Sequence, residues 1–355
     1  MTASEDYFQR LVDLDSLRNY LNDQFGSVDR YDVQHLQAGH SNETLLVKWG
    51  QRDLIIRRPP PGEKAEKAHD VLREYRVLDA LQETDVPVPP TLTACDDHEV
   101  IGSDFYVMEK VEGDVIRQEV PERFRNSNSR RTLGEELVDR LAQIHRVDYE
   151  AAGLGDFGHP EGFTERQVDT WSKQLIWAIS YTEDEREVPE LYEIGEWLKD
   201  NTPSEYPHTL VHGDYKMDNV MFAPGVPPEI AAIFDWELSA LGDPLTDVGW
   251  MLSFWRNPGD PEPASEELAY TYMENEEYAS RAELVERYEQ QSGIEYTNDT
   301  FYRTLAVYKL CGLGEMFFAR HLTGDSDDPL YPKMEDGVPR LAQRALNIIN
   351  GSEPL

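Results

Sequence analysis

The segment from Leu210 to Val220 contains the residues whose types and spacing could do chemistry. Asp214 and Asn219 lie five positions apart in an expected loop between apolar stretches, so a carboxylate and an amide can converge on one point. Asp235 follows sixteen positions after Asn219, at the end of a second apolar stretch. Phosphoryl transfer uses such a set, because one carboxylate orients the attacking hydroxyl while other oxygen ligands hold Mg²⁺ against the phosphates.

Two kinds of element must position these residues. Helical spacing of apolar residues predicts helices at about 1–30, 68–81, 135–146, 165–200, 264–291 and 298–321. Alternating or short apolar runs predict strands at about 33–37, 44–49, 54–58, 92–95, 105–110, 209–212 and 230–234. We therefore predict an α+β fold with a strand-rich N-terminal lobe, residues 1–111, and a mostly helical C-terminal lobe, residues 112–355.

The composition excludes several classes of protein. The 355-residue chain carries 33 Lys+Arg and 69 Asp+Glu, a formal net charge of −36. Such a surface repels phosphate backbones and anionic lipids, which argues against a nucleic-acid or membrane-surface binder. Hydrophobic residues make up 39% and aromatic residues 10%, too many for an acidic disordered protein. Two cysteines far apart indicate neither a disulfide framework nor a cysteine-based zinc site.

The N-terminus has neither the basic nor the apolar region of a secretory signal. No apolar run approaches the roughly 18 residues that a membrane span requires. We therefore expect a soluble, cytoplasmic protein with no membrane partner and no nucleic-acid partner.

The cations are chosen unequally, since nine are lysines and 24 are arginines. Many carboxylates with few lysines are typical of a protein that works in concentrated salt. At molar salt the Debye length is about 3 Å, so the self-repulsion of the carboxylates is largely screened. We expect a salt-adapted host, a halophilic archaeon. An acidic mesophilic protein, or one with a basic partner, is the alternative interpretation.

Three motifs in order resemble those of the aminoglycoside phosphotransferase and choline kinase superfamily. His-Gly-Asp at 212–214 followed by Asn219 matches the catalytic-loop pattern H-x-D-x-x-x-x-N. Asp235, followed by Trp and Glu, matches the metal-binding aspartate of this family, and residues 242–247 match its G-D-P-x-x-D segment. The resemblance implies a protein kinase-like, two-lobed fold with the active site in the cleft between the lobes.

The same resemblance implies a role for each motif residue. Asp214 would be the catalytic base, and Asn219 and Asp235 would be the Mg²⁺ ligands. Lys216 matches the lysine that contacts the γ-phosphate in Ser/Thr protein kinases.

The N-terminal lobe would then supply the nucleotide site, and ATP is the expected nucleotide. Arg57 leaves a strand and Glu74 lies on the following helix, so an ion pair between them would position the α- and β-phosphates. Arg58 is the alternative cation; an arginine offers a fork for phosphate but does not reproduce the point charge of a lysine. The other expected nucleotide contacts are a phosphate-covering loop and a hinge, with candidate residues Gly39, Ser41, Asn42, Glu109 and Val111.

Nearly the whole chain also resembles a narrower branch, related to the kinase domains fused to acyl-CoA dehydrogenases. The matching segments are 57–62, 68–69, 73–78, 163–171 and 173–174. In the fused proteins the kinase domain is implicated in phosphorylating hydroxyacyl-CoA intermediates, so such an ester or another hydroxylated metabolite is an expected acceptor. The branch also suggests candidates for the acceptor pocket, Arg166, Gln167 and Trp171.

Each of these residues also has a simpler interpretation. Asp and Asn commonly serve as loop caps and turn residues. Arg57 and Glu74 could form a purely structural ion pair, and Trp171 could pack in the core of a helix. Two motif residues, His212 and Asp247, are expected to support the loop structurally rather than to react.

The sequence thus predicts an enzyme that transfers the γ-phosphoryl group of ATP, with Mg²⁺, to the hydroxyl of a small molecule. An antibiotic phosphotransferase acting on an aminoglycoside or macrolide is one alternative, and a non-catalytic nucleotide-binding protein is another. A protein kinase is disfavoured, because Asp-Trp-Glu and Gly-Asp-Pro segments replace the Asp-Phe-Gly and Ala-Pro-Glu signals of that class. The acceptor, the choice of ATP or GTP and the oligomeric state stay open.

Overall fold

The computed structural model describes residues 3–36, 42–62, 70–263, 270–326 and 328–355. The chain forms two compact units. Unit 1 comprises Met1–Gly113 together with Ala231–Ser239, and unit 2 comprises Asp114–Ile230 together with Ala240–Leu355. The sequence patterns did not predict that a short segment from the C-terminal half belongs with the N-terminal unit.

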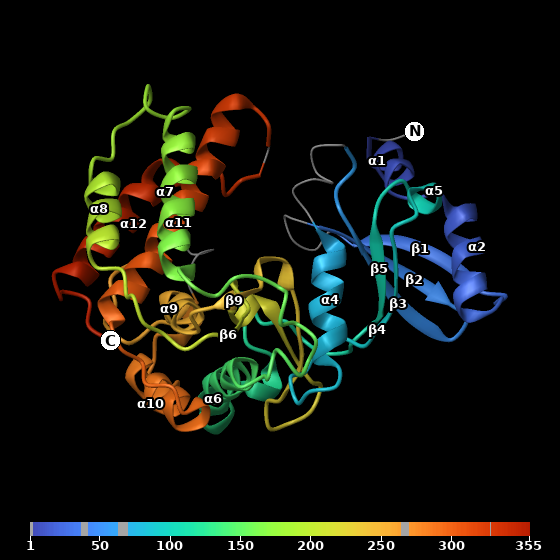
Figure 1. Cartoon of the computed structure of the whole chain (residues 1–355), viewed down its shortest axis with the longest axis horizontal. Coiled ribbons are helices and arrows are strands. Elements are labelled where there is room, and N and C mark those ends of the chain that lie inside the picture. Colours follow the sequence, from blue (N-terminus) through green and yellow to red (C-terminus); the bar gives the residue numbers. More distant parts are fainter. Residues whose placement is uncertain (1–2, 37–41, 63–69, 264–269, 327) are drawn as a thin grey trace. The chain divides into compact units, whose positions relative to one another are not determined.

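Unit 1 is built on an antiparallel sheet of five strands in the order β1-β2-β3-β5-β4 (Figure 1). The strands are β1 (Tyr31–Leu36), β2 (Glu43–Trp49), β3 (Arg52–Arg58), β4 (Thr91–Cys95) and β5 (Phe105–Glu109). A tight turn at Gly50 joins β2 to β3. Gly50 has a φ of 62° there, a backbone conformation that glycine adopts without steric cost.

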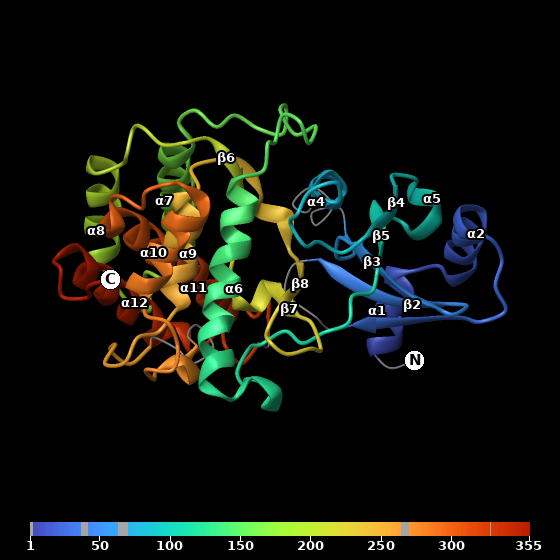
Figure 2. The same ribbon diagram turned by 90° about the horizontal axis from the view of Figure 1, so that it is seen from below.

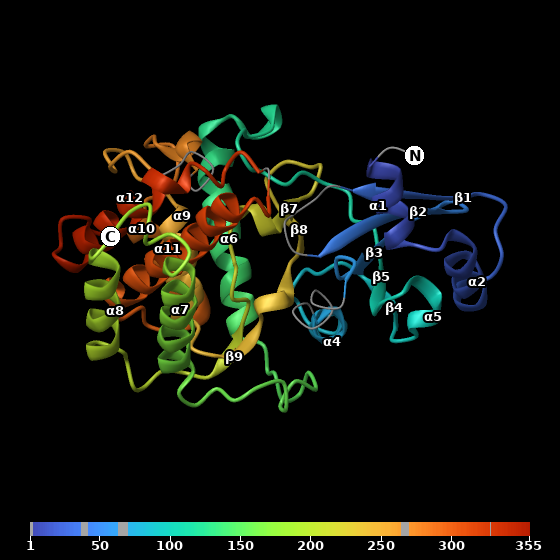
Figure 3. The same cartoon turned by 90° about the horizontal axis from the view of Figure 1, so that it is seen from above.

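Helices cover this sheet because its strands alternate side chains between two faces. The helices are α1 (Ala3–Leu11), α2 (Leu14–Phe25), α4 (Val71–Leu81) and α5 (His98–Ile101). The first two pack on one face, where α1 lies across the strands (Figure 3), and share a core with Leu45, Val47, Leu54 and Ile56. Asp13 caps the start of α2 through the Ser16 N–H.

The segment Ala231–Ser239 joins unit 1 through hydrogen bonds to its backbone. The Ile233 N–H donates to the Pro87 carbonyl at 2.9 Å, and Arg73 Nη2 on α4 donates to the Ser239 carbonyl at 3.0 Å. Its 3₁₀ turn η3 (Trp236–Leu238) contacts α4 and has the Trp236 side chain fully buried. These contacts fix the backbone around Asp235 within unit 1.

Unit 2 is mostly helical (Figure 2). Its α-helices are α6 (Ser127–His145), α7 (Phe163–Ile179), α8 (Glu190–Asp200), α9 (Leu245–Phe254), α10 (Arg281–Ser292), α11 (Asp299–Thr323) and α12 (Met334–Ile349). The long helix α11 contacts α7, α8, α9 and α12, while α6 runs beside α10. Helices α9 and α11 are thus far apart in the sequence but lie against each other in the fold.

Short strands and turns carry the polar motif. Strand β6 (Thr209–Val211) pairs antiparallel with β9 (Ala240–Gly242). The 3₁₀ turn η2 (Met217–Asn219) leads into β7 (Val220–Phe222), and β8 (Ile230–Ile233) follows. Together with the sheet of unit 1, this arrangement confirms the predicted α+β fold class.

Several predicted helices were wrong in extent: the segment 1–30 forms two helices, α1 and α2, and α6 begins at Ser127 rather than at about 135. The segment 165–200 is interrupted, because α7 ends at Ile179 and α8 begins only after Pro189. In the segment 264–291 the α-helix begins only at Arg281, where Ser280 and Glu283 form a capping box. Thr271–Met273 forms a 3₁₀ turn, and residues 264–269 lie outside the described residues. A cap residue decided the start of α10, whereas apolar spacing extended the expectation too far upstream.

Arginines inside unit 2 are paired with carboxylates. Arg281 donates to both oxygens of Asp260 at 2.7 and 2.9 Å, and Arg303 pairs with Asp299 at 2.8 Å. Both guanidinium groups are almost fully buried, so the pairing offsets the cost of removing the charges from water. Across the described ranges, no helix has the length and apolar character needed to span a bilayer.

Candidate active site

The backbone of the loop after β6 is held by one carboxylate. Asp247, on α9, accepts the His212 N–H at 2.6 Å and the Gly213 N–H at 2.8 Å. His145 contacts the same carboxylate at 3.3 Å. Gly213 adopts a φ of 82°, a left-handed conformation that glycine takes without steric cost, and this turns the chain just before Asp214.

Asp214 has a donor on each side of its carboxylate. Its Oδ1 accepts from the Trp250 indole Nε1 at 2.8 Å, and its Oδ2 accepts from Asn219 Nδ2 at 2.8 Å. Lys216 Nζ bridges both oxygens at 3.1 and 3.2 Å. The predicted residues Asp214, Lys216 and Asn219 are therefore brought together in unit 2.

The electrostatic environment keeps Asp214 ionised. Burial by itself would raise the pKa of this carboxyl group, but the ammonium groups of Lys216 and Lys309 hold the pKa below its usual range. A buried carboxylate that stays charged at neutral pH can accept a hydrogen bond from a hydroxyl.

Sequence reasoning missed Trp250 and Lys309. Lys309, on α11, donates to the Gly213 carbonyl at 2.6 Å, and its Nζ lies 4.0 Å from the centre of the Trp250 ring. Burial lowers the pKa of Lys309 to about 8. The available signal was a single lysine within an apolar helical run, in a chain with only nine lysines.

Of the acceptor-pocket candidates, Trp171 lies near this cluster. Its ring lies 5.3 Å from Lys309 Nζ, and its side chain is buried on α7. Arg166 is exposed and donates to the carbonyls of Glu161 and His159, which are local loop contacts. Gln167 is partly buried on the same helix.

In unit 1, Arg57 and Glu74 lie beside each other. Arg57 Nη2 is 3.9 Å from Glu74 Oε1, and Nη1 donates to Thr44 Oγ1 at 3.0 Å. Burial raises the pKa of the Glu74 carboxyl group, and Arg57 opposes that shift. Tyr106 is buried next to both groups.

Arg58 occupies a different environment. Its guanidinium is buried and donates to three carbonyls, those of Leu11, Pro59 and Ile101. Because consecutive residues of β3 point to opposite faces, only one of the two arginines can lie beside Glu74. Arg57 is that residue, and Arg58 joins β3 to the backbone at Leu11 and Ile101.

Asp235 is held in an unusual backbone conformation. Its φ is 65°, in the left-handed region that non-glycine residues rarely adopt, and its Oδ1 lies 3.7 Å from Arg57 Nη2. Such strain persists where surrounding structure fixes it, often at functional positions. Nearby, Asn42 Nδ2 donates to Glu237 Oε2 at 3.4 Å, so Asn42 lies with the Asp235 segment in unit 1.

The expected hinge and phosphate loop are described only in part. The Glu109 N–H donates to the Pro90 carbonyl at 2.8 Å, and its side chain pairs with Arg52 at 3.0 Å. Val111 follows β5 and is partly buried. Gly39 and Ser41 lie outside the described residues.

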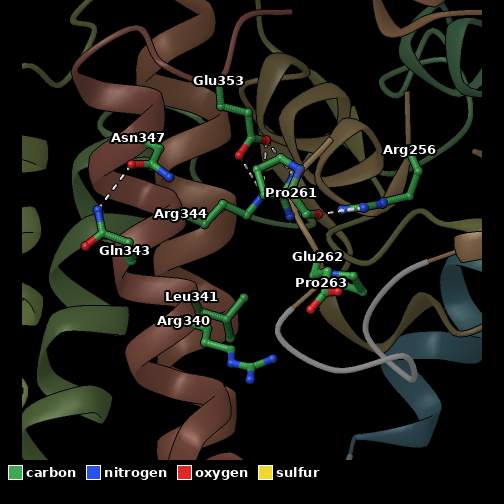
Figure 4. A pocket seen from close by; sticks show the side chains of 10 residues that line it. All are labelled: Arg256, Pro261, Glu262, Pro263, Arg340, Leu341, Gln343, Arg344, Asn347 and Glu353. Atoms are coloured by element: carbon green, nitrogen blue, oxygen red, sulfur yellow. Dashed lines mark hydrogen bonds and ion pairs between the residues drawn. The ribbon is translucent and has the colours of Figure 1, made fainter. Parts of the chain in front are cut away.

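An open pocket of about 310 Å³ lies in another part of unit 2, and no predicted site residue lines it (Figure 4). Two of its arginines, Arg256 and Arg344, are already paired with Glu274 and Glu353. Among the side chains that the structure describes, no group of three or more His, Cys, Asp or Glu could hold a metal by itself. A metal with few protein ligands is compatible with that finding, because Mg²⁺ commonly takes its remaining ligands from phosphates and water.

The fold is that of solved small-molecule phosphotransferases. The profile of the phosphotransferase enzyme family matches residues 32–284, well over half of the chain. The chain belongs to this family.

Curated relatives carry the name acyl-CoA dehydrogenase family member 11. The rat protein (Rattus norvegicus) is 32% identical over 358 residues, which cover 96% of this chain and 44% of that protein. The probable acyl-CoA dehydrogenase IBR3 of Arabidopsis thaliana is 33% identical over 315 residues, covering 84% of this chain and 37% of that protein. The chain thus spans less than half the length of these relatives.

Solved structures give the same fold. A Ralstonia eutropha protein, provisionally assigned as an aminoglycoside phosphotransferase, aligns with a TM-score of 0.79 at 28% identity, over 96% of this chain and 99% of that one. Choline kinase from Cryptosporidium parvum aligns with a TM-score of 0.63 at 10% identity, over 96% and 97%. Family and fold together support a small-molecule phosphotransferase, and neither identifies its acceptor.

Proposed function

We propose that this protein transfers the γ-phosphoryl group of a nucleoside triphosphate, with Mg²⁺, to a hydroxyl group of a small molecule. The observation that carries the proposal is the Asp214 carboxylate, which is buried, held below its usual pKa and bracketed by Trp250 and Asn219. A group so fixed suits a catalytic base, because positioning supplies much of the rate in phosphoryl transfer.

In the proposed reaction, Asp214 accepts a hydrogen bond from the acceptor hydroxyl and takes its proton. The acceptor oxygen forms a bond to the γ-phosphorus as the bond from that phosphorus to the β–γ bridging oxygen breaks, and the nucleoside diphosphate leaves. Lys216 contacts both carboxylate oxygens, so its movement toward a phosphate would free one lone pair on each. Trp250 and Asn219 would continue to hold the carboxylate.

Other residues would bind the nucleoside triphosphate, which is the phosphate donor. We propose that Arg57 contacts the α- or β-phosphate, with Glu74 restraining its guanidinium, and that Asn42 belongs to the phosphate-covering loop with Gly39 and Ser41. Since the Glu109 N–H is engaged with Pro90, the backbone of Val111 is the better candidate for adenine contacts.

A carboxylate and an amide oxygen are suitable ligands for Mg²⁺, and Asp235 and Asn219 would provide them. The Asn219 nitrogen is committed to Asp214, which leaves the amide oxygen for a metal. A bound Mg²⁺ would neutralise charge on the phosphates. The strained backbone of Asp235 is consistent with a position fixed for such a role.

The acceptor is the finer part of the proposal. The ammonium groups of Lys216 and Lys309 are offset by the carboxylates of Asp214 and Asp247, so the charge of this cluster does not by itself select an acceptor. The similarity to relatives named acyl-CoA dehydrogenase family member 11 favours a hydroxyacyl-CoA ester as the acceptor. Trp171 is the residue we retain as a candidate for the acceptor pocket.

The test is Asp214→Asn, assayed with ATP and GTP against hydroxylated metabolites, hydroxyacyl-CoA esters, aminoglycosides and macrolides. We expect a loss of turnover of about 100- to 10,000-fold, because asparagine keeps the shape of the side chain but cannot take the proton of the hydroxyl. Nucleotide affinity measured by calorimetry should change little. Asp200→Asn, at the exposed end of α8, is the matched control and should keep full activity.

The outcomes separate the alternatives. Turnover of an aminoglycoside or macrolide alone would favour an antibiotic phosphotransferase. Nucleotide binding without any product would favour a non-catalytic protein, and full activity of Asp214→Asn would overturn the assignment of the base.

A further inference from the structure

Trp250 comes from the same helix that holds the loop backbone. Asp247 and Trp250 are three positions apart on α9, so they share one face of that helix. The first accepts the backbone N–H groups of His212 and Gly213, and the second donates to the Asp214 side chain. One rigid element therefore sets both the path of the loop and the direction of its carboxylate.

The Trp250 ring is in turn fixed by α11. Lys309 Nζ lies 4.0 Å from the ring centre, a distance suited to a cation–π interaction. The same ammonium group donates to the Gly213 carbonyl at 2.6 Å. It thus ties the indole to the residue immediately before Asp214.

The partners of the Asp214 carboxylate differ in mobility. Trp250 is a planar side chain packed within a buried helix, where it is 3% exposed, and it has two rotatable side-chain bonds. Lys216 contacts the same carboxylate through a long flexible chain and is not needed to define its plane.

We propose that Trp250 is a positioning residue that orients the Asp214 carboxylate for the acceptor hydroxyl, and that Lys309 holds the indole in place. Lys216 is the exchangeable partner. The inference rests on the proposed function. It assigns to α9 a second task beyond supporting the loop backbone, because the indole N–H fixes Oδ1 and leaves the carboxylate in one rotamer when Lys216 moves away.

One experiment tests the contact without any turnover. The indole N–H signals of the protein are recorded by relaxation-optimised nitrogen–proton NMR, and the Trp250 signal is identified from its loss in Trp250→Phe. We expect Asp214→Asn to shift this signal and to leave that of Trp255 in place, since the Trp255 indole donates to the Ala279 carbonyl instead. An unchanged Trp250 signal would overturn the proposal.

A second experiment measures the consequence. Trp250→Phe should lower kcat by about 10- to 100-fold, the effect expected when a reacting group loses its orientation, with the KM for nucleotide nearly unchanged. Trp255→Phe removes a comparable buried indole bond and should keep kcat within about twofold, apart from any loss of stability. If Trp250→Phe does not fold, Lys309→Met should give a smaller fall in kcat and also shift the Trp250 indole signal.

The results distinguish this inference from the proposed function. Wild-type activity that survives intact in Trp250→Phe overturns the positioning role and leaves the function standing. A protein without phosphoryl transfer overturns the function, while the NMR result still decides whether Trp250 and Asp214 are coupled.

Discussion

At the residue scale, the unusual feature of the site is a buried ammonium group. Lys309 extends from α11 to the loop that carries Asp214, and burial lowers the pKa of its ammonium group to about 8. The carboxylates of Asp214 and Asp247 oppose this shift, whereas Lys216 adds to it. The charge of Lys309 is thus retained at neutral pH at a cost in folding free energy.

That cost predicts a pH-dependent effect of Lys309→Met on stability. An unfolded lysine has a pKa of about 10.4, so between about pH 8 and 10.4 the unfolded chain binds a proton that the folded protein lacks. Over this range the wild type gains stability relative to the variant as the pH rises. Denaturant unfolding of both proteins at pH 7 to 10.5 measures the difference.

Lys199→Met is the control, because Glu196 raises the pKa of that exposed lysine. The wild type should not gain stability relative to Lys199→Met as the pH rises from about 8 to 10.4. A constant difference between wild type and Lys309→Met across this pH range would contradict the assigned environment of Lys309.

At the element scale, the position of α9 depends on a close approach to α11. A Cβ added to Gly249 would lie 2.7 Å from backbone atoms of Tyr302, which cannot move as a flexible side chain could. Gly249 therefore permits α9 and α11 to pack closely. This packing sets where Asp247 and Trp250 lie relative to the loop that carries Asp214.

Gly249→Ala should consequently lower the free energy of unfolding by about 1–3 kcal/mol, the usual cost of overpacking a core. We also expect a fall in turnover, because a shifted α9 misplaces the donor to Asp214. Gly225→Ala, where an added Cβ meets nothing within 4 Å, should change stability by less than about 0.5 kcal/mol. Equal stability of the two variants would show that α9 adjusts freely.

At the scale of the whole molecule, the net charge of −36 predicts a strong response to salt. The Debye length falls from about 10 Å at 0.1 M to about 3 Å at 1 M, so repulsion among surface carboxylates weakens. We expect the thermal unfolding midpoint to rise by about 5 °C or more between these concentrations of KCl, measured by calorimetry.

The exposed acidic run Glu183, Asp184, Glu185 and Glu187 provides the control. Replacing these residues by their amides should raise the midpoint at low salt and reduce its salt dependence. A midpoint independent of KCl would contradict the proposal of a salt-adapted protein. The halophilic host itself stays a prediction.

Among the described residues, the cations that are most buried are arginines. Arg281 and Arg303 form buried pairs with Asp260 and Asp299, for which a planar, permanently charged fork is well suited. Among the lysines, Lys216 and Lys309 both lie at Asp214. Two of the nine lysines thus lie beside the proposed base.

The sequence alone determined the fold class and which local residues converge at Asp214. Asp214 and Asn219 lie five positions apart, so their spacing predicted a convergence that the chain forms within a single loop. Lys216, named from the resemblance, contacts the same carboxylate. Apolar periodicity likewise predicted the strands of unit 1 and much of the helical unit, because side-chain patterning is a local property of each element.

Only the tertiary structure decided which distant residues complete the cluster. Trp250 and Lys309 are 36 and 95 positions beyond Asp214, and nothing in their local pattern separates them from ordinary core residues of a helix. The choice of Arg57 over Arg58 similarly depends on which face of β3 meets Glu74. Such contacts arise from the packing of elements, and packing is a property of the folded chain rather than of any one segment.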